Sequence, residues 1–275
     1  MAREHITLAV VTDIHNGPRQ FKKPGHTALA ALREFVAGLG TAGTDLVVEM
    51  GDRINDVDYD SDRLHLGEVA EVFRAWDGPL YHLIGNHDVF NMDRTEIAEV
   101  LGRAVDNIAV SFKGWRLIFW QPSVVMSERW TYPVDQADLD WLDTALTEAD
   151  GPAVIFTHIP LHGEAMTGNP YFENRPTEAQ YEGAEALRAK LVGNSKVVLC
   201  VSGHAHLNDL RVIDGLPFVT VQSLTDTGLA SSEPALASAQ IKLGKDIAVE
   251  IYGRDPMVLR LPIRTDVGPE PLPPR

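Results

Sequence analysis

The chain has 275 residues, and its hydrophobic content of 44% is enough for a sizeable core in one large α/β domain or two small ones. The 24 Lys and Arg residues against 39 Asp and Glu residues give a net charge of -15, which repels polyanions and argues against a nucleic-acid polymer or an anionic membrane surface as partner. Because of this charge, substrates are expected to be small. A single cysteine, Cys200, excludes an intrachain disulfide.

The N-terminal part of the chain alternates strand and helix patterns. The apolar run over residues 6–11 predicts a buried strand, and residues 28–39 carry apolar side chains at helical spacing. A second strand is predicted over residues 45–50, and a further helix returns the chain to a strand over residues 80–84. This β-α-β-α-β order indicates right-handed crossovers and a largely parallel sheet, where ligands gather at the carboxyl ends of the strands.

The middle of the chain changes pattern. A hairpin with its turn at residues 113–114 indicates a second sheet, and a helix begins at Asp135. Residues 153–156 and 196–201 predict two more buried strands. Between them lie a polar, irregular segment over residues 163–176, which has the composition of a loop over a site, and then a predicted helix over residues 177–192.

Five of the predicted strands end in short blocks of possible metal ligands. One block, Gly85 to Asp88, is on its own ordinary turn chemistry. It becomes evidence for a metal site because four similar blocks occur elsewhere in the chain, each directly after an apolar run. Together the blocks supply oxygen and imidazole donors and no thiolate, from Asp13, His15, Asp52, Asn86, His158, His204 and His206.

This donor set indicates transition-metal ions such as Mn, Fe, Co or Zn in preference to Ca or Mg, and two ions in preference to one. Two ions roughly 3.5–4 Å apart, bridged by one carboxylate, would acidify a bridging water and bind the oxygens of a phosphoryl group. We assign Asp52 as the bridging carboxylate. A purely structural explanation of all seven side chains is disfavoured, because each unpaired buried Asp or His would carry a large desolvation cost.

The blocks D-x-H, G-D-x-x, G-N-H-D, a histidine after a strand, and G-H-x-H, in this order, resemble the calcineurin-like metallophosphoesterases over residues 6–206. The resemblance implies an α/β fold, a four-layer α/β/β/α sandwich around a dinuclear metal centre of Mn, Fe or Zn ions. It implies that His87 is the catalytic histidine and binds no metal. By the same resemblance, one ion is held by Asp13, His15, Asp52 and His206, and the other by Asp52, Asn86, His158 and His204.

The layout is similar to that of the bacterial class III phosphodiesterases, which act on cyclic nucleotides or glycerophosphodiesters. In the protein-phosphatase branch, the third residue after the bridging Asp is an Asp that pairs with the catalytic His. This chain has Asn55 at that position, with Asp56 beside it, which argues against that branch. We therefore expect a phosphodiesterase that attacks small phosphodiesters with a metal-bridging hydroxide, while His87 protonates the leaving oxygen or stabilises the transition state.

Three other functions remain open: a phosphomonoesterase, a pyrophosphatase of the ADP-ribose or CDP-alcohol type, and a non-catalytic scaffold of the same fold. Scaffolds typically lose ligands or the catalytic histidine, and this chain retains them all. Asn16, Asn55 and His162 are candidate substrate contacts. Asn16 and Arg53 would either contact phosphate or support the neighbouring ligands, and a polar loop residue such as His162 needs no function.

We expect residues 1–227 to form the metallophosphoesterase catalytic domain. Residues 228–275 are expected to be a C-terminal β extension that packs on the sandwich or at the interface of a homodimer, with a mobile Pro-rich tail. The N-terminus lacks a signal-peptide pattern, and no apolar stretch approaches the roughly 18 residues of a membrane span, so a cytoplasmic protein without a membrane partner is expected.

Overall fold

The computed structural model describes residues 4–164, 166–228 and 231–264, and the strands in these ranges form two mixed sheets of six. The first sheet contains β1 (Ile6–Val11), β2 (Leu46–Glu49), β3 (Leu80–His82), β10 (Ser238–Leu243), β11 (Asp246–Tyr252) and β12 (Met257–Pro262). The second contains β4 (Ile108–Phe112), β5 (Trp115–Phe119), β6 (Ala153–Phe156), β7 (Val197–Ser202), β8 (Asp209–Ile213) and β9 (Leu216–Thr220). Their strand orders are β12-β11-β10-β1-β2-β3 and β4-β5-β6-β7-β9-β8.

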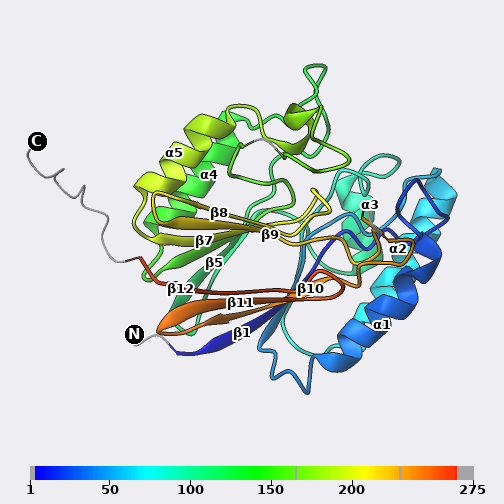
Figure 1. Ribbon diagram of the computed structural model, residues 1–275, viewed down its shortest axis with the longest axis horizontal. Coiled ribbons are helices and arrows are strands. Elements are labelled where there is room, and N and C mark those ends of the chain that lie inside the picture. Colours follow the sequence, from blue (N-terminus) through cyan, green and yellow to red (C-terminus); the bar gives the residue numbers. More distant parts are fainter. Residues whose placement is uncertain (1–3, 165, 229–230, 265–275) are drawn as a thin grey trace, which may run out of the picture.

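The helices lie outside the two sheets. Figure 1 shows the sheets stacked face to face, with one group of helices beside each outer face. They are α1 (Ala28–Gly38), α2 (Tyr59–Phe73), α3 (Arg94–Leu101), α4 (Gln136–Thr147) and α5 (Ala184–Gly193), with the short 3-10 helices η1 (Gly25–Thr27) and η2 (Pro176–Ala179). In the described ranges, no helix is both long enough and apolar enough to cross a membrane.

Three apolar clusters separate the layers. Alternate residues of β1 point to opposite faces, so that Leu8 and Val10 pack between the sheets while Ala9 and Val11 pack outward against α1 and α2. The third cluster joins the outer face of β5, β6 and β7 to α4 and α5. The layers therefore follow the order α/β/β/α, and the fold class expected from the sequence is confirmed.

The parallel strands bring five loops to one edge of the sandwich. β1, β2 and β3 are parallel to one another, as are β5, β6, β7 and β9. Hydrogen bonds between backbone groups and side chains join the loops of the two sheets at this edge. His204 N donates to Asp13 Oδ2 (3.0 Å), and Ser223 Oγ donates to Asp13 O (2.7 Å). The ligand blocks after β1, β2, β3, β6 and β7 therefore meet between the sheets.

Several elements differ from the sequence expectation. The helix predicted over residues 177–192 is divided into η2 and α5, with Gly183 in a left-handed conformation (φ 72°) before α5. The sequence pattern missed α3, which begins with a capping box between Asp93 and Glu96. The expected C-terminal β extension contributes β10, β11 and β12, and β10 pairs with β1, so that residues 238–262 continue the first sheet. The division of the chain at residue 227 stays a prediction. The expected Pro-rich tail over residues 269–274 lies outside the described residues.

Candidate metal centre

The structure brings the predicted ligands into two groups that share one carboxylate. The ligand atoms of Asp13, His15, Asp52 and His206 lie within 4.8 Å of one another, as do those of Asp52, His158 and His204. Asn86 Oδ1 lies 3.3 Å from His158 Nε2, which places the amide beside the second group. Asp52 Oδ2 lies 3.8 Å from His15 Nε2 and 3.5 Å from His158 Nε2, so Asp52 is positioned between the groups.

The loops that carry the ligands take an unusual backbone conformation. Asp13 and His15 both have a left-handed φ of 52°. Asp52, His204 and His206 are also left-handed, with φ values of 55°, 65° and 53°. Non-glycine residues in this region are strained, and such strain concentrates at functional sites. Five of the seven predicted ligands are therefore held in strained turns that direct their side chains into one space.

Two glycines permit the close approach of these loops. A Cβ atom on Gly85 would lie 2.1 Å from Asp52 Oδ1, and one on Gly203 would lie 2.1 Å from Thr12 Oγ1. Real Cβ atoms do not approach other heavy atoms this closely, so any larger residue would displace the ligand turn. The glycines of G-N-H-D and G-H-x-H are thus required by packing between loops as well as by turn conformation.

Each histidine of the groups has one ring nitrogen facing an acceptor outside the centre. His158 Nδ1 donates to Met50 O (2.8 Å), and His15 Nδ1 donates to Ile54 O (3.3 Å). His206 Nδ1 donates to Asp226 Oδ2 (2.9 Å), whereas His204 Nε2 donates to Glu178 O (2.9 Å). A ring nitrogen that faces an oxygen acceptor carries the proton, which leaves the other nitrogen free to bind a metal.

The inward atoms fit cations. His15 Nε2 and His206 Nε2 lie 3.0 Å apart, and when both rings are neutral with their outer nitrogens protonated, these two atoms present lone pairs to each other. The buried Asp13 Oδ1 accepts no well-aligned hydrogen bond from the described residues. Lone pairs that converge without protons between them are stabilised by a positive ion. The Asp and His clusters are therefore suited to a dinuclear metal site.

The pKa values of the ligands are of two kinds: burial lowers those of His15 and His204, whereas neighbouring charges outweigh burial at His158, His206 and Asp52. Burial alone would lower the pKa of His158, but the charge of Asp52 raises it to about 9. Burial would also lower the pKa of His206, but Asp13 and Asp226 raise it to about 9. Burial would raise the pKa of Asp52, yet His158, His87 and His15 lower it well below its usual value. The cluster thus attracts positive charge, and a metal must displace protons to bind.

His87 lies beside the centre and belongs to neither group. Its backbone N–H donates to Asp52 Oδ1 (2.9 Å), and its Nδ1 pairs with the Asp56 carboxylate. Lys23 Nζ lies 3.1 Å from His87 Nε2, and since an ammonium only donates, Nε2 is the acceptor. Asp56 therefore forms the Asp–His pair that the protein-phosphatase pattern places at the position of Asn55. The argument against the protein-phosphatase branch from Asn55 is overturned.

Sequence reasoning missed Lys23 and Asp226. Lys23 is only 6% exposed, and burial lowers its pKa although Asp52 and Asp56 act in the opposite direction. Nothing local in the sequence marks it. Asp226 orients His206, and Tyr171 from the expected covering loop donates its hydroxyl to the same carboxylate. The polar run after the 216–220 strand was an available signal for Asp226, since the ligand blocks also follow apolar strands.

The candidate substrate contacts lie elsewhere. Asn16 Nδ2 donates to His65 O (3.0 Å) and Glu68 Oε2 (2.9 Å), which ties its loop to α2. Asn55 Nδ2 donates to Pro18 O (2.8 Å), and His162 Nδ1 accepts from Glu164 N (3.1 Å). Among the described residues, the cavity at the centre is lined by other side chains: Gln20, Phe21, Lys23, Asp52, Asn86, His87, Met126, Tyr132, Tyr171, Phe172, Arg175, Glu178, His204 and His206.

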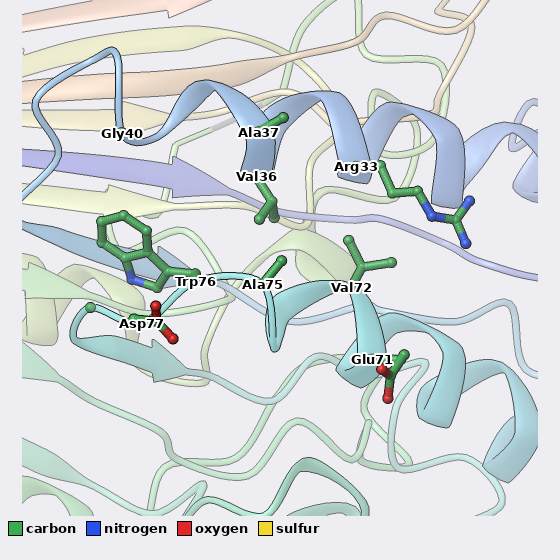
Figure 2. A pocket seen from close by; sticks show the side chains of 10 residues that line it. Arg33, Val36, Ala37, Gly40, Glu71, Val72, Ala75, Trp76 and Asp77 are labelled. Carbon is green, nitrogen blue, oxygen red and sulfur yellow. The ribbon is translucent and has the colours of Figure 1, made fainter.

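Of the cavities among the described residues, two are lined by Asn86 and His87, and three others are not. The cavity that contains the ligands, here called the ligand cavity, has a volume of about 340 Å³. A second of about 450 Å³, here called the side cavity, shares Asn86 and His87 with it. Figure 2 shows one of the others, which lies between α1 and α2 with Trp76 at one end and has a volume of about 650 Å³. The described residues that line this cavity between α1 and α2 include none of the predicted ligands.

Comparison with solved structures identifies proteins of the same fold at low sequence identity. A dimetal phosphatase from Danio rerio is 18% identical, with a TM-score of 0.77 over 94% of this chain and 99% of that chain. The purple acid phosphatase PPD1 from yellow lupin seeds is 10% identical, with a TM-score of 0.69 over 94% of this chain and 53% of that chain. GAP50, the anchor in the inner membrane complex of Plasmodium, is 12% identical, with a TM-score of 0.63 over 96% and 90%.

Comparison with curated protein sequences gave no match. The calcineurin-like phosphoesterase family matches residues 6–208, from the first strand to the last ligand block. Its position agrees with the two groups of ligand atoms around Asp52. Because the match covers more than half of the chain, this protein belongs to the calcineurin-like phosphoesterase family.

Proposed function

We propose that this metal-dependent phosphoesterase is a phosphodiesterase that hydrolyses small phosphodiesters. The observation that carries the proposal is the junction of two cavities at Asn86 and His87, beside the carboxylate that both ligand groups share. A phosphoryl group at Asp52 would have space for a substituent on each side. A diester has two substituents and uses both spaces, whereas a monoester uses one.

Bound metal ions, of which Mn, Fe and Zn match the donor set, would activate water and neutralise charge on the phosphoryl group. The chain's own residues would orient the substrate. His87 Nδ1 is held by Asp56, so Nε2 is the ring atom that faces the phosphoryl group or its leaving oxygen. Lys23 Nζ, now bonded to His87 Nε2, would donate to a phosphoryl oxygen instead.

A pyrophosphatase is the second candidate. Lys23 and Arg175 both line the ligand cavity, and two cations besides the metals would suit a substrate with a second phosphate. The Asp56–His87 pair also returns the phosphomonoesterase to consideration, since Asn55 no longer counts against it. The scaffold alternative has a relative in GAP50, which is named as an anchor, but the complete ligand set of this chain favours catalysis.

A substrate panel tests the proposal. Mn-loaded protein should be assayed on bis(p-nitrophenyl) phosphate, p-nitrophenyl phosphate and a nucleoside diphosphate sugar, with chelated protein as the control. We expect the highest kcat/KM for the diester and no activity after chelation. A preference for the monoester or for the diphosphate would replace the proposal with the corresponding alternative. Inactivity on every ester under Mn, Fe and Zn loading would favour the scaffold.

Two further expectations from the sequence stay predictions. One is a cytoplasmic location, which cell fractionation would check. The other is a homodimer. Light scattering of the intact chain would check the oligomeric state, and a monomer at micromolar concentration would contradict the dimer.

A further inference from the structure

The side cavity is lined mostly by apolar side chains. Two of them lie at the surface although they are hydrophobic, since Phe90 is 73% exposed and Val125 is 61% exposed. Large hydrophobic side chains exposed beside a ligand site commonly serve binding. The other apolar residues of the lining are Val89, Val124, Met126 and Tyr132.

The position of His87 connects this cavity to the chemistry. Asn86, His87, Met126 and Tyr132 line both cavities. On one side of the imidazole lies Lys23, which lines the ligand cavity, and on the other lies Asp56, which lines the side cavity. His87 therefore lies between a phosphoryl group held at Asp52 and the side cavity. A substituent of that phosphoryl group that occupies the side cavity must be joined to phosphorus by a bond that lies next to His87.

The far wall of the side cavity is anchored. The segment that carries Val124 and Val125 follows Gln121, whose Oε1 accepts from Ile84 N (2.9 Å) next to the Asn86 turn. Arg94 Nη2 donates to Pro122 O (2.7 Å) and fixes the same segment from α3. The wall is thus tied to the turn that carries His87, so the cavity is formed before any substrate binds.

We propose that the side cavity binds the leaving alcohol of the substrate and that this alcohol is aromatic or bulky and apolar. The proposal rests on the proposed function. In hydrolysis, water forms a new bond to phosphorus, the bond from phosphorus to the alcohol oxygen breaks, and that oxygen takes up a proton beside His87. Phe90 and Met126 offer ring and thioether surfaces to an aromatic group, while the Asp56 carboxylate disfavours an anionic one. Aryl and bulky alkyl esters are therefore preferred to esters of polar alcohols such as glycerol.

Two substrates of similar leaving-group acidity test this preference, methyl 2-naphthyl phosphate and methyl phenyl phosphate. In the Mn-loaded wild-type protein, we expect kcat/KM for the naphthyl ester to exceed that for the phenyl ester by about tenfold, the discrimination that a hydrophobic pocket gives to added apolar surface. Phe90→Ala should reduce the ratio of the two values toward one. Phe21→Ala is the matched control, since Phe21 is 72% exposed but lines the ligand cavity, and it should leave the ratio unchanged.

A binding measurement separates this inference from the proposed function. Fluorescence titration of metal-free protein with 2-naphthol should give saturable binding that Phe90→Ala weakens and Phe21→Ala does not. If esters are hydrolysed but Phe90→Ala changes neither the ratio nor naphthol binding, the leaving-group site is overturned and the proposed function stands. A ratio that responds to Phe21→Ala instead would place the leaving alcohol in the ligand cavity. Failure to hydrolyse any ester overturns the proposed function and the leaving-group role together.

Discussion

Two buried clusters of charged side chains lie next to each other in this protein, and they are built differently. In the cluster beneath the site, Arg53 Nη1 donates to Asp88 Oδ2 (2.8 Å), and the same guanidinium pairs with Glu49. Glu49 also binds His82 Nδ1 at 2.9 Å, and Asp88 accepts from the backbone of Asp52 at 3.0 Å. Positive and negative groups in this Arg53 cluster are thus paired within the protein.

The ligand cluster has no fixed cation such as Arg53. Its carboxylates are paired with histidines, which carry a positive charge only when they are protonated. Its carboxylates and imidazoles direct lone pairs at a common space, and Asp13 Oδ1 accepts no well-aligned hydrogen bond from the described residues. Buried charge without a partner is costly, so the ligand cluster requires protons or metal ions from outside, whereas the carboxylates of the Arg53 cluster have a guanidinium partner within the chain. Burial and charge alone therefore do not distinguish a structural cluster from a functional one. The convergence of several ligand atoms on one space does, since the Arg53 cluster also contains a buried atom without a hydrogen-bond partner among the described residues, Arg53 Nε.

The sharpest test of the ligand cluster is Asp52→Asn compared with Asp13→Asn. Asp52 belongs to both groups, so its variant should lose both ions and all measurable activity, while Asp13→Asn should retain the ion at the second group. Elemental analysis and kcat/KM measure the two effects, and the wild type should bind about two ions. Equal and mild losses in the two variants would contradict the shared role of Asp52.

His87→Ala separates chemistry from metal binding at the boundary of the two clusters. His87 is in neither ligand group, so the variant should retain its ions. As a general acid, His87 would contribute roughly 10²–10⁴-fold to kcat for poor, alkoxide leaving groups. The effect should be much smaller with p-nitrophenolate, which leaves without a proton. If both kinds of substrate slow equally at full metal content, His87 stabilises phosphoryl charge and does not donate a proton.

Arg53→Met tests the claim that the neighbouring cluster is structural. Removal of the cation would leave Glu49 and Asp88 buried without their partner, and we expect a loss of roughly 3–5 kcal/mol in the free energy of unfolding. Urea denaturation of the metal-free protein measures it. Arg74→Met is the matched control, since Arg74 forms an exposed pair with Glu71 that should contribute little. Similar stability of the two variants would refute the distinction between the clusters.

Of the variants considered, Asp226→Asn should have the smallest effect, and the property it changes is the affinity of one metal site. The Asp226 carboxylate accepts from His206 Nδ1 and orients the ring, and loss of such a partner typically weakens metal binding by about 10–100-fold. Metal titration by calorimetry should show one weakened site and one unchanged site. Weakening of both sites would mean that Asp226 acts on the whole cluster by charge, without specific orientation of His206.

The sequence alone determined the family, the α/β sandwich and the approximate ends of most strands. Each ligand block directly follows an apolar run, and a buried parallel strand must deliver its next residues to the same edge as its neighbours. Local pattern was therefore sufficient to group residues as distant as Asp13 and His206, which the structure brings together. The same local pattern failed at α3 and at the break between η2 and α5, where short helices are defined by capping and tertiary packing.

Only the tertiary structure decided which polar side chains outside the blocks face the centre. Asn55 N donates to Asn16 O (3.0 Å), and its side chain donates to Pro18 O, so the loop contact turns Asn55 away and leaves Asp56 to pair with His87. Lys23 reaches the cavity through a turn closed by its own bridge to Gln20. The direction of a side chain in an irregular turn depends on hydrogen bonds to segments distant in sequence, and no local periodicity records them.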